Sequence, residues 1–121
     1  MAKIFLDANV FINIVEKRKI PKRQSFLNHT LFISPLSIHI LTYIYKYKVP
    51  DDRLKEPNGF FHLVSFDKEI TIKALIGPTT DFEDNVQLHS AANTNCDIFL
   101  TSDRQLLNIK FFGKTVIASS L

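Results

Sequence analysis

The sequence predicts an α/β fold in which helices flank a parallel or mostly parallel sheet. Short apolar runs of strand length alternate along the chain with segments of helical spacing, and this alternation is typical of β–α–β units. The chain has 121 residues, of which 45% are hydrophobic and eleven are phenylalanine, and this suffices for one packed core. We therefore expect a single domain over residues 1–121, in which no internal repeat or low-complexity segment occurs.

The first half of the chain begins with an apolar strand, expected over residues 3–6. A helix over about residues 9–17 follows, since its apolar side chains cover one broad face. Pro21 ends this helix, and a second short helix is expected over residues 22–29. A brief second strand is expected over residues 31–33.

The segment after the second strand carries both strand and helix signals. Alternating tyrosines near its end fit a strand, whereas Leu41 and Tyr45 are one helical turn apart. Ser34 and Pro35 supply an N-cap and a first helical residue, so we predict a helix over residues 36–47. This helix is apolar nearly all round, which indicates either burial or a subunit interface.

The second half of the chain alternates in the same way. Residues 50–59 are polar and rich in turn residues, so we expect a loop there and a strand over residues 60–66. Asp67 can cap a helix that runs to about residue 75 and ends before Gly77-Pro78. Two further strands are expected over residues 98–100 and 115–117.

Three aspartates occupy the starts of helices or turns beside the expected strands. Asp7 directly follows the first strand, and Asp103 follows a later one. Asp84 lies in the first turn of a helix for which Thr80 is the expected cap, with Glu83 completing a capping box. Each acid alone has an ordinary explanation, because aspartate also caps helices, favours their first turn and occupies turns.

Taken together, the three acids predict a divalent-metal site. The carboxyl ends of parallel strands meet at one edge of the sheet, where open α/β folds bind their ligands. Carboxylates gathered at that edge repel one another. A bound Mg²⁺ or Mn²⁺ relieves this repulsion, whereas helix N-termini alone do not.

The net charge of the chain is only +3, but its distribution is uneven. Five of the seven residues from position 17 to position 23 are basic, namely Lys17, Arg18, Lys19, Lys22 and Arg23. A basic surface beside a metal-loaded acidic pocket suits a phosphate-rich polymer such as RNA. The same residues also fit a solvated helix end, because Lys and Arg stabilise helix C-termini.

The cellular compartment is indicated by cysteine usage and by apolar run length. The single cysteine, Cys96, allows no internal disulfide and fits a reducing cytoplasm as a small core residue. No apolar run approaches the roughly 18 residues of a membrane span. The N-terminus lacks the features of a secretory leader, so we expect a cytoplasmic protein without membrane association.

Three short motifs resemble those of PIN-domain nucleases. They lie at residues 4–12 (IFLDANVFI), 81–87 (DFEDNVQ) and 96–103 (CDIFLTSD), and their order and spacing fit over essentially the whole chain. The most similar subgroup is that of small PIN proteins such as the toxins of VapBC-type toxin–antitoxin pairs. The resemblance implies a three-layer α/β/α sandwich, Mg²⁺- or Mn²⁺-dependent endoribonuclease activity, frequent homodimers and often a small antitoxin partner.

The resemblance also implies roles for individual residues. Asp7, Asp84 and Asp103 correspond to the family's catalytic, metal-binding acids, and Asp81 is a nearby acid that would assist the metal through a water. The side chains that would orient these groups are Asn9, Ser37 and Thr101, which also fit ordinary cap, helix and turn positions. The basic residues between positions 17 and 23 would hold the RNA backbone.

One position departs from the family's pattern. The family usually has a glutamate early in the helix after the second strand, and this chain has Ile40 there. His39 is adjacent but points about 100° away around a helix. Loss of this acid leaves three alternatives, namely weak binding of one ion, completion of the site by the substrate phosphate, or loss of catalysis. A catalytically degenerate PIN domain that binds RNA or protein is therefore the alternative to a ribonuclease.

Other chemistries have weaker support in the sequence. The four histidines lack zinc spacing, and three glycines are too few for a phosphate-binding loop. A receiver-like domain would need paired acids after the first strand, which are absent, although Lys110 or Lys114 would supply its late lysine.

Overall fold

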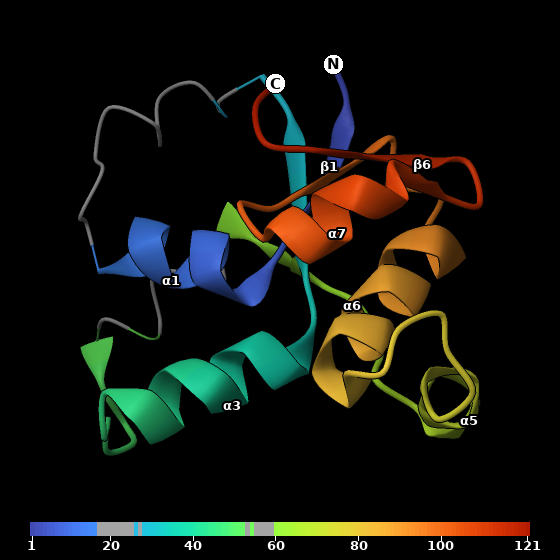
Figure 1. Ribbon diagram of the computed structural model, residues 1–121. Helices are drawn as coiled ribbons and strands as arrows, with labels where there is room; N and C mark the ends of the chain where they lie inside the picture. The colour runs from blue at the N-terminus through green and yellow to red at the C-terminus, as the bar shows by residue number, and fades with distance from the viewer. Residues whose placement is uncertain (17–25, 27, 53, 55–59) are drawn as a thin grey trace.

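The strands of the protein form one mostly parallel sheet. The computed structural model describes residues 1–16, 26, 28–52, 54 and 60–121 (Figure 1). Within these ranges the strands are β1 (Lys3–Leu6), β2 (Thr30–Ile33), β3 (His62–Leu63), β4 (Ile98–Leu100), β5 (Phe111–Phe112) and β6 (Thr115–Ala118). Their order is β3-β2-β1-β4-β6-β5, and every neighbouring pair is parallel except β5 with β6. The predicted mostly parallel sheet is confirmed.

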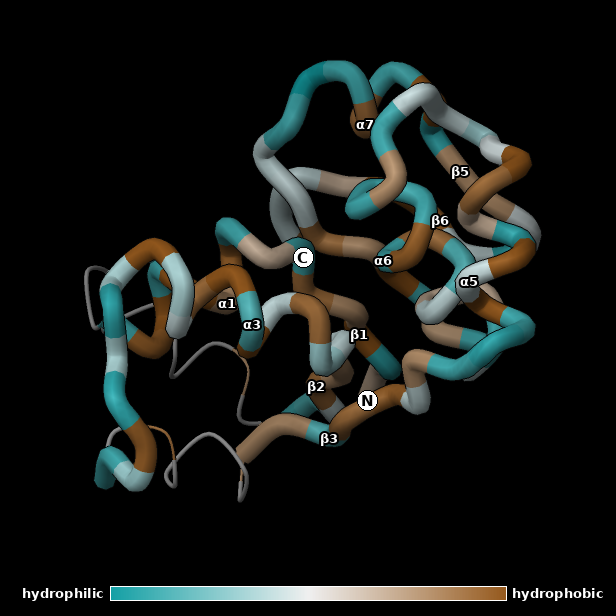
Figure 2. The backbone as a smooth tube through the Cα atoms, turned by 90° about the horizontal axis from the view of Figure 1, so that it is seen from below, coloured by the Kyte–Doolittle hydropathy of each residue, from teal (hydrophilic) through white to brown (hydrophobic). Residues whose placement is uncertain are grey.

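Helices cover both faces of this sheet. They are α1 (Ala8–Val15), α3 (Pro35–Ile44), α5 (Lys68–Ala74), α6 (Phe82–Asn93) and α7 (Arg104–Ile109). Helices α1 and α3 pack together on one side, and α5 and α6 pack together on the other (Figure 1 and Figure 2). The three-layer α/β/α arrangement implied by the motifs is thus confirmed.

The central strands divide their side chains between the two layers with a period of two residues. Ile4 and Leu6 belong to the apolar cluster that contains buried residues of α1 and α3. Phe5 points the other way, into the cluster that contains residues of α6 and α7. Its ring stacks on that of Phe99, with centroids 5.5 Å apart. Side chains buried on both faces fix the register of β1, because a slip of one residue would exchange the two sets.

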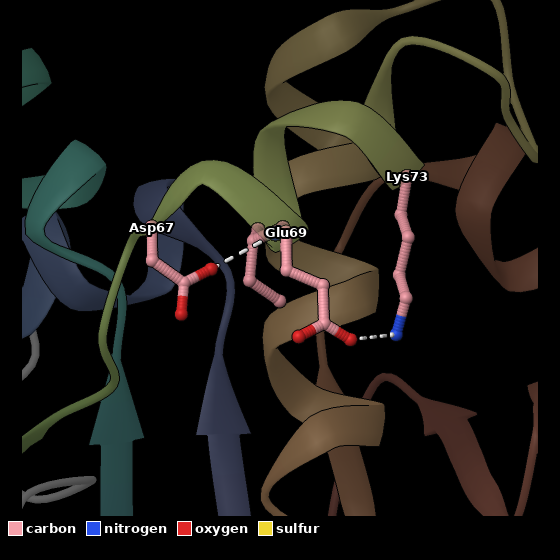
Figure 3. A network of polar contacts seen from close by, with 4 residues as sticks. Asp67, Glu69 and Lys73 are labelled. Carbon is pink, nitrogen blue, oxygen red and sulfur yellow. Dashed lines mark hydrogen bonds and ion pairs between the residues drawn. The ribbon is translucent and has the colours of Figure 1, made fainter.

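Polar side chains cap each helix of the described part of the chain. The N-caps are Asp7, Ser34, Asp67, Asp81 and Asp103. Figure 3 shows this arrangement for α5, where Asp67 accepts from the Ile70 amide at 2.9 Å and Glu69 pairs with Lys73. An aspartate before a helix satisfies an amide without an intrahelical partner and complements the positive end of the helix. The predicted caps Ser34 and Asp67 are confirmed.

The predicted cap of α6 is wrong. The cap is Asp81 and not Thr80, because the Asp81 side chain accepts a hydrogen bond from the Asp84 amide at 2.9 Å. The preceding segment is held differently, since Thr79 makes hydrogen bonds to the buried side chain of Asn85. Asp84 still lies in the first turn of α6, as the sequence indicated.

Several element boundaries also differ from the predictions. The strand expected over residues 60–66 shortens to β3. The helix expected over residues 36–47 ends at Ile44, and Lys46 has a positive φ of 54° that a continuing helix does not allow. The helix expected over residues 9–17 ends at Val15, and most of the one expected over residues 22–29 lies outside the described residues.

Two short elements near the C-terminus have no counterpart among the predicted elements. Helix α7 has six residues, and β5 has two. Strands β5 and β6 form a hairpin whose turn contains Gly113 at a φ of 62°, a conformation that glycine adopts without steric cost. Within the described residues, no helix has the length and apolar character needed to cross a membrane.

Candidate functional site

The four acids named from the sequence line one pocket at the carboxyl edge of the sheet. Strands β1 and β4 are parallel neighbours whose last residues, Leu6 and Leu100, stand in register. The acids that follow these strands, Asp7 and Asp103, therefore lie at one edge, and Asp81 and Asp84 at the start of α6 line the same pocket. The pocket has a volume of about 150 Å³, and its lining residues are Asp7, Ala8, Asn9, Ile40, Asp81, Glu83, Asp84, Gln87 and Asp103. No lysine or arginine occurs among these described residues.

Asp7 is the most deeply buried of these acids, with 5% of its surface exposed. Its Oδ1 accepts a hydrogen bond from the Ala8 amide at 2.7 Å, and its Oδ2 accepts one from Thr101 Oγ1 at 2.6 Å. Burial raises the pKa of Asp7, hydrogen bonds from Thr101, Ala8 and Gln87 oppose that rise, and the charge of Asp103 adds to it.

Thr101 links two of the acids through one buried hydroxyl. Besides donating to Asp7, its Oγ1 accepts a hydrogen bond from the backbone amide of Asp103 at 3.0 Å. Its own amide continues the sheet by donating to the carbonyl of Ala118. The position of Thr101 at the end of β4 therefore fixes Asp7 relative to the backbone of Asp103.

The pKa of Asp84 reflects the negative charge that gathers in the pocket. Burial raises its pKa from the ordinary value of 3.8 to about 7, and the charges of Asp81, Asp7, Asp103 and Glu83 contribute in that order. These four acids all raise the pKa of Asp84, and no basic side chain among the described lining residues offsets their negative charge. A cation placed among them would reverse the shift.

The donor chemistry of this pocket fits a hard divalent cation. Mg²⁺ and Mn²⁺ prefer oxygen ligands, and the ionisable side chains of the pocket are all carboxylates. One oxygen of Asp81 and one of Asp103 accept from helix amides, which leaves the second oxygen of each for a ligand.

The carboxylates line the same pocket without converging on a common point. Among the described residues, no group of three or more His, Cys, Asp or Glu side chains is arranged to hold a metal ion. Mutual repulsion opposes their closer approach, and a cation favours it. Among the four predicted aspartates, Asp84 is the one whose carboxylate oxygens accept no hydrogen bond from the described part of the chain.

One residue of the pocket is missing from the set named from the sequence. Gln87 is 2% exposed, and its Oε1 accepts a hydrogen bond from the Ala8 amide at 2.8 Å. It therefore ties α6 to the start of α1, next to Asp7. Its spacing, three residues after Asp84, places it on the same face of α6 as that acid, but this spacing does not reveal the contact with Ala8.

The remaining predicted residues take different positions. Asn9 is exposed and lines the pocket, and Ile40 lines it as well. Ser37 is fully buried and is not a lining residue, and its Oγ has no hydrogen-bond partner among the described residues. His39 is exposed and stacks on Tyr43 with ring centroids 6.1 Å apart. The basic residues Lys17, Arg18, Lys19, Lys22 and Arg23 lie outside the described residues.

Comparison with known proteins places the chain in a family. A family model of the PIN domain matches residues 4–112. The chain belongs to the PIN-domain family. Members of this family are generally nucleases, and they typically use divalent metal ions. A comparison with curated proteins finds no match.

A solved structure with the same fold is that of VapBC2 from Rickettsia felis, determined in complex with a DNA fragment from their promoter. The TM-score is 0.70, the sequence identity is 15%, and the alignment covers 96% of this PIN domain and 97% of the other chain. At this identity the similarity shows the fold, and the activity of this PIN domain has to be argued from its own residues.

Proposed function

We propose that this PIN domain is a metal-dependent ribonuclease that hydrolyses phosphodiester bonds of RNA. The observation that carries the proposal is the pocket that Asp7, Asp84 and Asp103 line together, with the pKa of Asp84 raised to about 7 by burial and by its acidic neighbours. Carboxylates gathered without a basic partner repel one another and lower the stability of the fold. Groups of this kind, with strongly shifted pKa values, cluster at functional sites.

The residues of the pocket have distinct parts in the proposed reaction. Asp7, Asp84 and Asp103 would hold Mg²⁺ or Mn²⁺, and Asp81 would assist at the rim. The bound ion would lower the pKa of a water and neutralise charge that grows on the phosphoryl oxygens. Thr101 and Gln87 hold Asp7 in place by hydrogen bonds, so that little reorganisation is needed when the substrate phosphate arrives.

We further propose that the protein is the toxin of a toxin–antitoxin pair. The fold similarity to VapBC2 over nearly the full length of both chains supports this role. A small antitoxin would then be its protein partner, and the active form in the cytoplasm would be a homodimer. The basic residues from Lys17 to Arg23 would hold the RNA backbone.

Cleavage of RNA by the purified protein, with and without Mg²⁺ or Mn²⁺, tests the ribonuclease. We expect metal-dependent cleavage that Asp7→Asn abolishes. Asp67→Asn is the matched control, because Asp67 is likewise a helix cap but does not line the pocket. Absence of cleavage by the wild type on total RNA at saturating metal would refute the activity, and cleavage that survives Asp7→Asn would show that it does not come from this pocket.

A second candidate function rests on Ile40. The family's usual glutamate would stand at this position, and the apolar side chain of Ile40 lines the pocket beside the acids. Loss of this glutamate is the change expected in a degenerate PIN domain, which would bind RNA or protein without cleaving it. Comparing the wild type with Ile40→Glu separates the two functions. Activity only in the variant supports the degenerate domain, and equal activity in both supports the ribonuclease with three acids.

A further inference from the structure

A second pocket adjoins the acidic one at the same edge of the sheet. It has a volume of about 110 Å³ and lies between α1 and the ends of β4 and β6. The α1 residues Val10, Asn13 and Ile14 form one wall, because residues three and four apart share a helix face. Leu100 and Phe26 complete the apolar part of the lining.

The rim of this pocket is polar. Leu100 and Ala118 stand in register in neighbouring parallel strands, so the residues after them, including Ser102 and Ser119, leave the sheet at one place. Asn13 adds an amide from α1. Among the residues that the structure describes, no hydrogen bond engages the side chains of Asn13, Ser102 or Ser119. They therefore offer both donors and acceptors to a ligand.

Thr101 connects this pocket to the acidic site. It lines the second pocket, and its hydroxyl donates to Asp7 Oδ2 at 2.6 Å. A molecule bound in this pocket would thus be separated from Asp7 only by the side chain of Thr101. A nucleotide has this layout, since its base is attached through the ribose to the phosphate.

The size of the pocket selects the kind of base. An apolar cavity of about 150 Å³ is known to accept a benzene ring, whereas pockets for drug-sized ligands measure roughly 300–1,000 Å³. The volume of about 110 Å³ is closer to that of the benzene-binding cavity than to that of a drug-sized pocket, and it therefore suits one six-membered ring better than the fused rings of a purine. Apolar walls contact the faces of such a ring, and amide and hydroxyl groups at the rim suit its polar edge.

We propose that this pocket binds a pyrimidine base of the RNA next to the phosphate that is cleaved. This assignment rests on the proposed ribonuclease function and gives it a sequence preference. Val10, Ile14 and Leu100 would contact the ring, and Asn13 with the serines at the rim would bind its edge.

The test uses free nucleosides, because they lack the phosphate that would bind at the acidic site. Chemical-shift mapping of the isotope-labelled protein with cytidine, uridine, adenosine and guanosine reports binding at each backbone amide. We expect saturable shifts at Asn13, Ser102 and Ser119 with at least one pyrimidine, and purine binding roughly tenfold weaker or absent. Asn13→Leu should weaken pyrimidine binding roughly tenfold by removing a hydrogen-bond partner. Ser119→Trp should abolish it by filling the pocket.

Asn93→Leu is the matched control, because Asn93 is exposed at the far end of α6 and should leave nucleoside binding unchanged. The proposal is overturned if no nucleoside gives saturable shifts at the pocket, or if purines bind as well as pyrimidines. It is also overturned if phenol or indole binds there and nucleosides do not, which would assign the pocket to an aromatic side chain of a protein partner. None of these readouts needs cleavage, so failure of the ribonuclease assay leaves the binding result separately interpretable.

Discussion

Thr101 gives the sharpest test of how single residues position the acids. Thr101→Val keeps the shape of the side chain but removes the donor to Asp7 Oδ2 and the acceptor for the Asp103 amide. We expect a loss of about 1–3 kcal/mol in the free energy of unfolding and a metal affinity about 10–100-fold lower. Urea denaturation and calorimetric titration with Mn²⁺ measure the two effects.

Thr115→Val provides the control for this variant. Thr115 is also a buried threonine, but its hydroxyl donates to the carbonyl of Cys96, far from the acids along β6. It should lose comparable stability and retain full metal affinity. Equal metal affinities in the two variants would show that the hydroxyl of Thr101 has only a structural part.

The raised pKa of Asp84 predicts a pH dependence of stability in the absence of metal. In the unfolded chain this carboxyl group loses its proton near pH 4, and in the folded protein it does so near pH 7. The folded state therefore binds more protons between these values, and the contribution of Asp84 to stability falls as the pH rises from about 4 to 7. Asp84→Asn should be stabilised relative to the wild type by an amount that grows over this interval.

Thermal denaturation at a series of pH values in chelator measures this effect. Glu69→Gln is the control, since Glu69 is an exposed acid on α5 outside the pocket. A difference between Asp84→Asn and wild type that stays constant from pH 4.5 to pH 7.5 would contradict the prediction.

The common pocket of the acids could be predicted from the sequence because it depends on strand ends. Asp7 and Asp103 follow apolar strands, and parallel strands bring such residues to one edge whatever the details of packing. Gln87 could not be found in the same way. Its contact with Ala8 spans 79 positions and depends on how α6 lies against α1. Spacing within one helix does not report that arrangement.

At the scale of secondary-structure elements, Asn85 connects α5 to α6. Its Oδ1 accepts from Thr79, and its Nδ2 donates to the carbonyls of Ala74 and Thr79 at 2.8 and 2.9 Å. This buried amide holds the segment that leads into Asp81, the cap of α6. Asn85→Leu preserves the approximate volume but leaves these backbone groups without partners, and we expect a loss of about 3 kcal/mol in stability.

Comparison with Asp67→Ala separates site disruption from general weakening. Loss of the Asp67 cap should cost about 1 kcal/mol and leave metal affinity unchanged. Asn85→Leu should in addition lower metal affinity, because Asp81 and Asp84 lose their fixed approach to the pocket. Unchanged affinity in a folded Asn85→Leu protein, measured by Mn²⁺ titration, would show that α6 positions its acids without this segment.

The same segment shows why the start of α6 was predicted one residue too early. Thr80 and Asp81 are both good caps, and the sequence favoured Thr80 because Glu83 completes a capping-box pattern. The hydrogen bonds between Thr79 and Asn85 decide the outcome by fixing the chain before Asp81. Helix α7 and strand β5 were not predicted because six and two residues carry too little periodicity to be recognised.

At the scale of the whole molecule, the acids lie where three parts of the chain come together. Asp7 follows β1, Asp84 begins α6 and Asp103 precedes α7, so their repulsion opposes the docking of these elements. Alternating burial on β1 and β4 holds the layers together against it. A cation that binds only the folded arrangement would stabilise the entire domain.

We therefore expect Mg²⁺ or Mn²⁺ to raise the melting temperature. At a concentration one hundred times the dissociation constant, binding contributes about 2.7 kcal/mol, which corresponds to roughly 10 °C for a domain of this size. Differential scanning fluorimetry across a metal series measures the shift. Asp84→Asn should melt higher than the wild type in chelator and gain little from metal, because the same carboxylate causes the repulsion and binds the ion. A wild type that melts at the same temperature with and without metal, or an Asp84→Asn variant that gains as much from metal as the wild type, would contradict an ion site built from these acids.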